Sequence, residues 1–173
     1  MTLFNKTIMI GSQEWSINNL DVETFRNGEM IPEAKSDEEW QKMAEEKKPA
    51  WCYHPRKYQF DQRHGRLYNW YAINDIRGLA PSGWRIPDIY DWELLQNFLG
   101  ERIDEMLKST SWKGTNKSGF DALPSGVRCG PDTIPEWEFQ GDKEEEYACF
   151  WTCTENEEEY AYSIIFGDLV NLL

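Results

Sequence analysis

The stretch LAPSGWRIPDIYDWELLQNFLG, residues 79–100, carries the strongest local signals in the chain. Its PSG tripeptide at 81–83 is typical of a turn, and Asp88 stands where an N-terminal helix cap belongs. The spacing that follows predicts a helix over residues 89–99, and Gly100 suits a left-handed C-terminal cap. The apolar face of this helix is formed by Ile89, Trp92, Leu95 and Leu99.

The N-terminal part of the chain predicts short strands and turns. Residues 7–20, TIMIGSQEWSINNL, alternate weakly between apolar and polar side chains and break at Gly11. This pattern is expected of two short strands joined by a turn. The dipeptide NG at 27–28 is a strong signal for a tight turn. We expect Trp15 and Leu20 to lie in the core.

Two further segments predict helices. In SDEEWQKMAEEKK, residues 36–48, Ser36 and Glu39 have the spacing of a capping box, and Pro49 ends the helix. The segment GRLYNWYAIND, residues 65–75, places large side chains three and four positions apart, which predicts a short helix. A strand stays open as the alternative there, because aromatic residues also favour sheets.

The second half of the chain predicts fewer helices and more strands. Residues 103–107 continue the helical spacing for a turn or two, and the sequence becomes loop-like from Thr110 onward. Three aromatic runs separated by acidic turns then read as short strands, at 136–140, 147–154 and 160–170. Helices first and strands later is the order typical of an α+β fold.

Length and composition limit the classes of protein that the chain can belong to. Its 173 residues contain no repeat or linker, so we expect one α+β domain over residues 1–173. Aromatic side chains make up 14% of the chain, which favours a loop-rich fold held by rings. The net charge of −13 argues against nucleic acid and anionic membrane surfaces as partners. No export signal or bilayer-spanning run is visible, so we expect no membrane insertion.

The cysteine pattern does not indicate a metal site. Cys52, Cys129, Cys149 and Cys153 form no CxxC pair, and the chain has only two histidines, so zinc is not predicted. If residues 149–153 form a strand, the two cysteines at its ends lie about 13 Å apart, too far for a disulfide. We therefore expect thiols or longer-range pairs, and no metal or other cofactor.

Five motifs in fixed order resemble those of the Fibrobacter succinogenes major paralogous domain family. The resemblance extends from about Thr7 to Phe166 and is carried by IGSQEWSINNL, GRLYNWYA, PSGWRIPDIYDWELLQNFLG, NKSGFDALPSGVR and FWTCTE. It implies a C-type-lectin-like fold related to formylglycine-generating domains. Two main helices, a small antiparallel sheet and long irregular loops are then expected, with a helix at GRLYNWYA.

The resemblance also raises expectations about location and about the end of the chain. Members of the family are commonly predicted to be exported or surface lipoproteins of Bacteroidota and Fibrobacterota, which implies an extracellular or cell-surface location. Cys153 stands where the family usually has a hydroxyl residue. The chain stops at Leu173 without the family's usual last strand, so we expect an open sheet edge that can recruit another chain.

A non-catalytic binding module is the function that the sequence favours. Lectin-like folds present long loops, and tryptophan, amide, guanidinium and carboxylate groups in such loops can bind a glycan or a protein ligand. Calcium-dependent sugar binding is not expected, because the EPN, QPD and WND tripeptides are absent. The candidate ligand-binding residues are Trp112, Asn116, Lys117, Arg128, Trp137 and Glu155.

Two alternatives from other classes stay open. The acidic surface and the expected open edge also fit a structural surface domain that associates with itself. An enzyme related to formylglycine-generating proteins is the second alternative, but its thiol pair would have to come from Cys149 and Cys153, which are four positions apart. A pair of carboxylates at glycosidase spacing has no specificity in a chain with 31 acidic residues.

Overall fold

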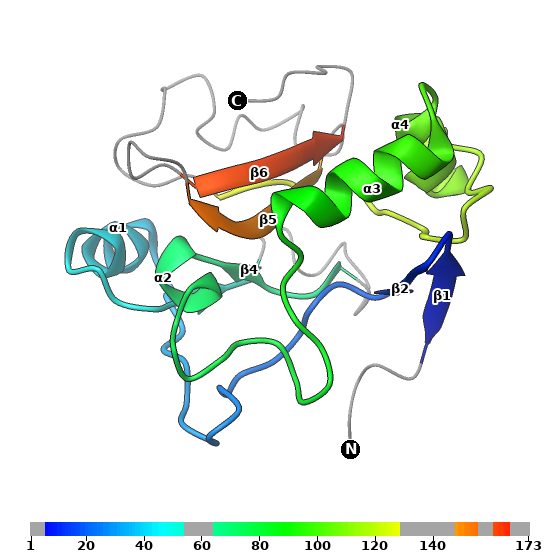
Figure 1. The fold of residues 1–173 in the computed structure, drawn as a ribbon. Coiled ribbons are helices and arrows are strands. Elements are labelled where there is room, and N and C mark those ends of the chain that lie inside the picture. Colours follow the sequence, from blue (N-terminus) through cyan, green and yellow to red (C-terminus); the bar gives the residue numbers. More distant parts are fainter. Residues whose placement is uncertain (1–5, 54–63, 129–147, 156–160, 167–173) are drawn as a thin grey trace.

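The protein has an α+β fold, as predicted. The computed structural model describes residues 6–53, 64–128, 148–155 and 161–166. Figure 1 shows short helices placed among two-stranded hairpins, and no single large sheet joins the described strands. The helices are α1 (Asp37–Glu45), α2 (Trp70–Ile73), α3 (Ile89–Leu99), α4 (Ile103–Leu107) and the 3₁₀ turn η2 (Thr110–Trp112). The strands are β1 (Thr7–Ile10), β2 (Gln13–Ser16), β3 (Trp51–Cys52), β4 (Leu67–Tyr68), β5 (Ala148–Glu155) and β6 (Ala161–Phe166).

The predicted N-terminal hairpin is confirmed. β1 and β2 pair antiparallel, with Ile10 opposite Gln13 and Ile8 opposite Trp15. Gly11 in the connecting turn has a φ of 60°, a value that glycine adopts without the steric cost other residues meet. The tight turn predicted at 27–28 also forms, because Gly28 has a φ of 86° and donates its N–H to the carbonyl of Phe25 over 2.9 Å.

The predicted helix at 36–48 forms but ends earlier than expected. The Ser36 hydroxyl accepts the N–H of Glu39 over 3.2 Å, so the predicted cap is present. The last helical residue is Glu45, because Lys47 adopts a φ of 54°. The N–H of Lys47 then bonds to Ala44 and that of Lys48 to Met43, which closes the helix in a Schellman motif before Pro49 is reached.

The helix predicted at 65–75 is only partly correct. Leu67 and Tyr68 are a strand, β4, that pairs with the distant segment β3. The helix α2 covers a single turn that begins after Asn69, whose Oδ1 accepts the N–H groups of both Ala72 and Ala50. The same side chain donates to the Lys48 carbonyl over 2.8 Å. Asn69 therefore caps α2 and ties it to the segment before β3.

The helix α3 has the predicted limits. Asp88 accepts the N–H of Asp91 over 3.0 Å, and the Asp91 carboxylate accepts the N–H of Asp88 over 2.8 Å, so a complete capping box starts the helix. Gly100 ends it and has a φ of 77°. Its ψ of −162° is extended rather than left-handed helical, so the predicted glycine cap has a different conformation from the one expected.

The last described strands, β5 and β6, form an antiparallel hairpin with Ala148 opposite Phe166 and Trp151 opposite Ser163. Figure 1 shows α3 running alongside this hairpin. The pairing confirms two of the three predicted C-terminal strands, and the third, at 136–140, lies outside the described residues. In place of the expected single small sheet, the described residues form three separate two-stranded sheets.

Most of the interior is divided between two large hydrophobic clusters. The first surrounds Trp92, whose ring centroid lies 4.9 Å from Trp15, 5.8 Å from Phe150, 5.9 Å from Phe166 and 6.1 Å from Phe120. The second cluster packs Phe25, Ile31, Trp51, Tyr68, Ala72, Ile73 and Leu79. Trp70 and Trp151 are partly buried against the second cluster, and their rings lie 5.9 Å apart. None of the described helices is long and apolar enough to cross a membrane.

The substitution Trp92→Ala should lower the free energy of unfolding by about 3–5 kcal/mol, since it removes a large buried ring and leaves a cavity among four other rings. Urea unfolding followed by tryptophan fluorescence measures this loss. Leu94→Ala on the exposed face of the same helix is the matched control, and it should change the free energy by less than about 0.5 kcal/mol. Equal losses for the two variants would contradict the central position of Trp92.

Candidate functional site

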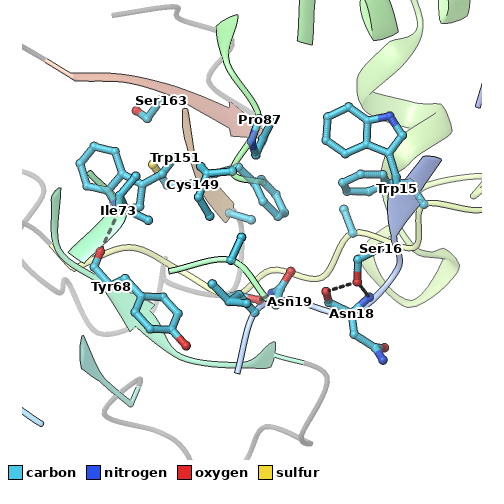
Figure 2. Close-up of a pocket in the computed structure, with 18 of the residues that line it drawn as sticks. Trp15, Ser16, Asn18, Asn19, Tyr68, Ile73, Pro87, Cys149, Trp151 and Ser163 are labelled. Atoms are coloured by element: carbon cyan, nitrogen blue, oxygen red, sulfur yellow. Dashed lines mark hydrogen bonds between the residues drawn. The ribbon is translucent and has the colours of Figure 1, made fainter. Parts of the chain in front are cut away.

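A cavity of about 1050 Å³ lies at the centre of the fold. Figure 2 shows residues from β2 and the segment after it on one side, and residues from β5 and β6 on the other. Several unbroken runs of residues line the cavity, so its wall contains backbone as well as side chains. The longest of these runs are 12–20, 83–87, 125–128 and 148–151.

Aromatic rings form much of the apolar wall. Trp15, Trp84 and Trp151 contribute indole rings, and Trp151 is held in place because its Nε1–H donates to the Tyr68 carbonyl over 2.8 Å. The Tyr68 hydroxyl donates to the carbonyl of Val22 and accepts its N–H. Burial raises the pKa of Tyr68 above its ordinary value, so this phenol stays protonated near neutral pH.

A charged network closes the cavity beside the start of α3. The guanidinium of Arg85 donates to Asp91 over 2.6 Å, and the side-chain amide of Gln13 donates to the Asp91 carbonyl over 3.0 Å. Burial alone would raise the pKa of Asp91, but Arg85 and the Asp88 N–H outweigh it and hold that pKa below its usual value. This network fixes β2 to the first turn of α3.

Arg66 is a buried cation in the cavity wall. Its guanidinium bonds to Asp21 and Glu23, donates to the Tyr53 hydroxyl over 2.9 Å, and lies 4.3 Å from the ring centroid of Trp51. These contacts supply both the opposite charges and the aromatic face that a buried guanidinium requires. Arg66 is therefore fixed in position by contacts on several sides.

The hydrogen bonding of the cavity wall is incomplete. Within the described residues, the N–H groups of Trp15 Nε1, Trp92 Nε1 and Arg66 Nε are shielded from solvent and have no partner, and all three residues line the cavity. Native interiors pair nearly all such groups. Hydrogen bonding is thus less complete around the cavity than in the rest of the described interior.

Asn19 joins three segments at the cavity. Its side-chain amide donates to the His64 carbonyl over 3.0 Å and to the Ser125 hydroxyl over 2.9 Å. The carbonyl of Leu20 accepts the N–H of Arg66 over 3.1 Å in the same region. The segment after β2 is therefore anchored at its far end, which keeps this side of the cavity in place.

Trp112 does not occupy the surface position that the sequence predicted. Its side chain is only 7% exposed and belongs to the cluster around Trp92, with the ammonium of Lys108 4.7 Å from its ring centroid. Neither ring face is available to stack on a sugar, so the assignment of Trp112 to a ligand-binding surface is corrected. The polar sequence around it had suggested exposure, but η2 turns the ring inward.

The other predicted site residues are not brought together into one site. Asn116 closes its own loop, donating to Asp121 over 3.0 Å and accepting the Asp121 N–H over 2.9 Å, and Lys117 beside it is exposed. Glu155 is exposed at the end of β5. Trp137 lies outside the described residues. Asn116, Lys117 and Glu155 do not line the cavity.

Arg128 is the predicted residue that does line the cavity. Its side chain is nearly buried, bonds to Asp37 at the start of α1, and lies 5.4 Å from the ring centroid of Trp40. The sequence reading missed the longest run of the wall, residues 12–20, because Trp15 in it was assigned to the core. The polar pair at 18–19 directly after a strand is the signal that could have indicated it.

The described thiols do not form a reactive pair. Cys52 is buried, and burial raises its pKa to about 11, which keeps it protonated. Cys149 and Cys153 lie on β5, as predicted, so their separation follows strand geometry. Burial also raises the pKa of Cys153, whose thiol faces the Ile86 carbonyl. Among the described residues no group of three or more acidic, histidine or cysteine side chains could hold a metal ion.

Fold and site together define the molecule as an α+β protein built around a central cavity. Comparison with protein families places residues 8–171 on the Fibrobacter succinogenes major domain. The chain therefore belongs to this family, in agreement with the five motifs. Neither the curated proteins nor the solved structures include a match.

The substitution Asp91→Asn should lower the free energy of unfolding at pH 7 by about 1 kcal/mol, since it weakens the charge-assisted bonds that join β2 to α3. The pKa of Asp91 is lowered by folding, so its contribution is present above the unfolded value of about 4 and disappears as the pH falls through the folded value. Urea unfolding at several pH values should therefore show the difference shrinking below about pH 4. Glu93→Gln, an exposed carboxylate on the same helix, is the control, and a difference that is independent of pH would contradict this role.

Proposed function

We propose that the protein is a non-catalytic binding module whose central cavity takes a glycan or a protein ligand. The observation that supports this function is the cavity of about 1050 Å³, which is at the upper end of the range of ligand sites. It replaces the exposed loop surface as the candidate site, because Trp112 is buried and the other described candidates are scattered.

The chemistry of the wall is suited to ligands that combine apolar faces with polar groups. Indole rings from Trp15, Trp84 and Trp151 offer surfaces for a pyranose ring or an apolar side chain. The side-chain amide of Asn18 lies on the same wall and can bond to hydroxyl or peptide groups. The same set of groups therefore serves either class of ligand.

We further propose that the fold is a C-type-lectin-like variant and that the protein works as part of a bacterial surface protein. Family membership and the combination of α3 with small antiparallel hairpins support the fold assignment. The net charge of −13 supports ligands other than nucleic acid. The surface location rests on the family resemblance.

A structural role through self-association is the second candidate function. Its support is an apolar stripe on the outer face of α3, where Tyr90, Leu94 and Phe98 are 73%, 48% and 65% exposed. Residues four positions apart lie on one side of a helix, so the three side chains are neighbours. Such a stripe lies away from the cavity, and the two functions can be tested separately.

The substitution Trp84→Ala should weaken ligand binding at least tenfold, because Trp84 is partly exposed and forms part of the cavity wall. Ligands are first found on arrays of glycans and of extended peptides, and their affinities are then measured by isothermal titration calorimetry. Tyr90→Ala removes an aromatic ring outside the cavity and should leave affinity within twofold. If the two substitutions weaken binding equally, or only Tyr90→Ala does, the cavity is not the site.

A further inference from the structure

We propose that the cavity is a slot for one extended strand of a second, basic polypeptide, which pairs with the edge of β2 that no described strand occupies and lies against β5. This inference rests on the proposed binding function and specifies its ligand class. Strand addition of this kind obtains affinity from main-chain hydrogen bonds and specificity from pockets for alternate side chains. Both kinds of contact can be traced in the cavity wall.

The pairing of β2 with β1 shows which main-chain groups of β2 point away from β1. The N–H of Ile17 donates to the carbonyl of Lys6, so the pair next to it, Thr7 and Ser16, is not hydrogen-bonded across the ladder. The alternation makes the pair of Met9 and Glu14 not hydrogen-bonded either. The main-chain N–H and C=O groups of Glu14 and Ser16 therefore point away from β1.

This edge borders the cavity. All four residues of β2 line the cavity, and the run continues to Leu20, whereas no residue of β1 lines it. The cavity thus lies on the side of β2 opposite to β1. An incoming strand would find the main-chain groups of Glu14 and Ser16 at that edge, one pair every two residues as in any antiparallel or parallel ladder.

The opposite side of the cavity is the outer edge of β5. β6 occupies one edge of β5, and the other edge is held at its ends, where Gly126 bridges Ala148 and the Pro87 carbonyl accepts the N–H of Cys153 over 2.9 Å. Residues 149–151, between these two points, line the cavity. The slot therefore lies between β2 and β5.

The faces of the slot are apolar and differ from each other. On one face lie Trp92, Phe120 and Phe150 of the first cluster, and on the other lie Trp151 and Ile73, which pack in the second cluster. Successive side chains of an extended peptide point to opposite faces, so apolar residues on both sides of a strand would be buried here.

Charge favours a basic partner over a second copy of the chain. Two copies with a net charge of −13 each repel one another, whereas a segment with lysine or arginine beside its apolar residues is attracted. The arginines that line the slot are already paired, Arg66 with Asp21 and Glu23, Arg85 with Asp91, and Arg128 with Asp37. The middle of the bound strand should therefore be uncharged, with its basic residues outside the slot.

The test uses the full chain and a designed probe, acetyl-Lys-Lys-Val-Val-Thr-Val-Val-Lys-Lys-amide with a fluorescent label, in an anisotropy titration. We expect saturable binding. A probe with the same side chains and N-methyl groups on alternate main-chain nitrogens should bind at least tenfold more weakly, because it cannot form the ladder. A probe with glutamate in place of its lysine residues should also bind at least tenfold more weakly.

Two opposed proline substitutions provide the matched variants. Ser16→Pro removes an N–H that faces the cavity and should weaken binding of the probe at least tenfold. Thr7→Pro makes the same change in the opposite residue, whose N–H faces away from the cavity, and should leave the affinity within twofold. Thermal unfolding of each variant checks that it is folded.

The outcomes separate this inference from the proposed function. If glycans bind in a manner sensitive to Trp84→Ala while the probe does not bind, the strand slot is wrong and the binding function stands. Equal binding of the N-methylated probe, or no effect of Ser16→Pro, also overturns strand pairing. Dimerisation at micromolar concentration that Ser16→Pro abolishes would overturn the basic partner in favour of a second copy. If neither glycans nor the probe bind, both proposals fail.

Discussion

The packing of the Trp92 ring is the constraint on which the rest of the structure depends. This one side chain on α3 contacts aromatic rings from β2, from the loop at 120, from β5 and from β6. β2, the loop at 120 and the hairpin of β5 and β6 are far apart in the sequence, and Trp92 contacts a ring in each of them. Because α3 is also fixed to β2 through Asp91 and Gln13, the helix sets the position of both hairpins.

The same arrangement accounts for the cavity. Trp92 joins the N-terminal and C-terminal hairpins at one end, and Asn19 joins neighbouring segments at the other. Between these points, β2 and β5 are not paired with each other. Large aromatic rings between β2 and β5 hold these strands farther apart than the hydrogen bonds of a sheet would. The aromatic-rich core thereby leaves a space between them. Trp15 and Arg66, whose Nε1–H and Nε–H have no hydrogen-bond partner among the described residues, both line this space.

The sequence predicted well those elements whose limits depend on local signals. The limits of α3 follow from Asp88 and Gly100, and the first hairpin follows from its alternation around Gly11. The segment at 67–68 has the residue spacing of a helix, and a helix was the prediction. It forms a strand because it pairs with β3, about sixteen positions earlier in the sequence. No local pattern can reveal such a contact.

The candidate site was harder to predict than the fold. Aromatic and polar residues in a loop suggested a surface, yet Trp112 is buried because η2 directs its ring into the cluster around Trp92. Arg128 lines the cavity, but its ion-pair partner Asp37 is at the start of α1, 91 positions earlier. The cavity is built from runs of residues that only the tertiary structure brings together, so a search for individual reactive side chains could not find it.

Amide hydrogen exchange followed by nuclear magnetic resonance tests the central claim, that the cavity edge of β2, which no described strand occupies, is open for pairing. The N–H of Trp15 points to Ile8 and should be protected, while those of Glu14 and Ser16 should exchange at least a hundredfold faster in the protein alone. A saturating ligand that pairs with this edge should slow exchange at Glu14 and Ser16 and leave Trp15 unchanged. Equal protection of all three amides without ligand would contradict the account.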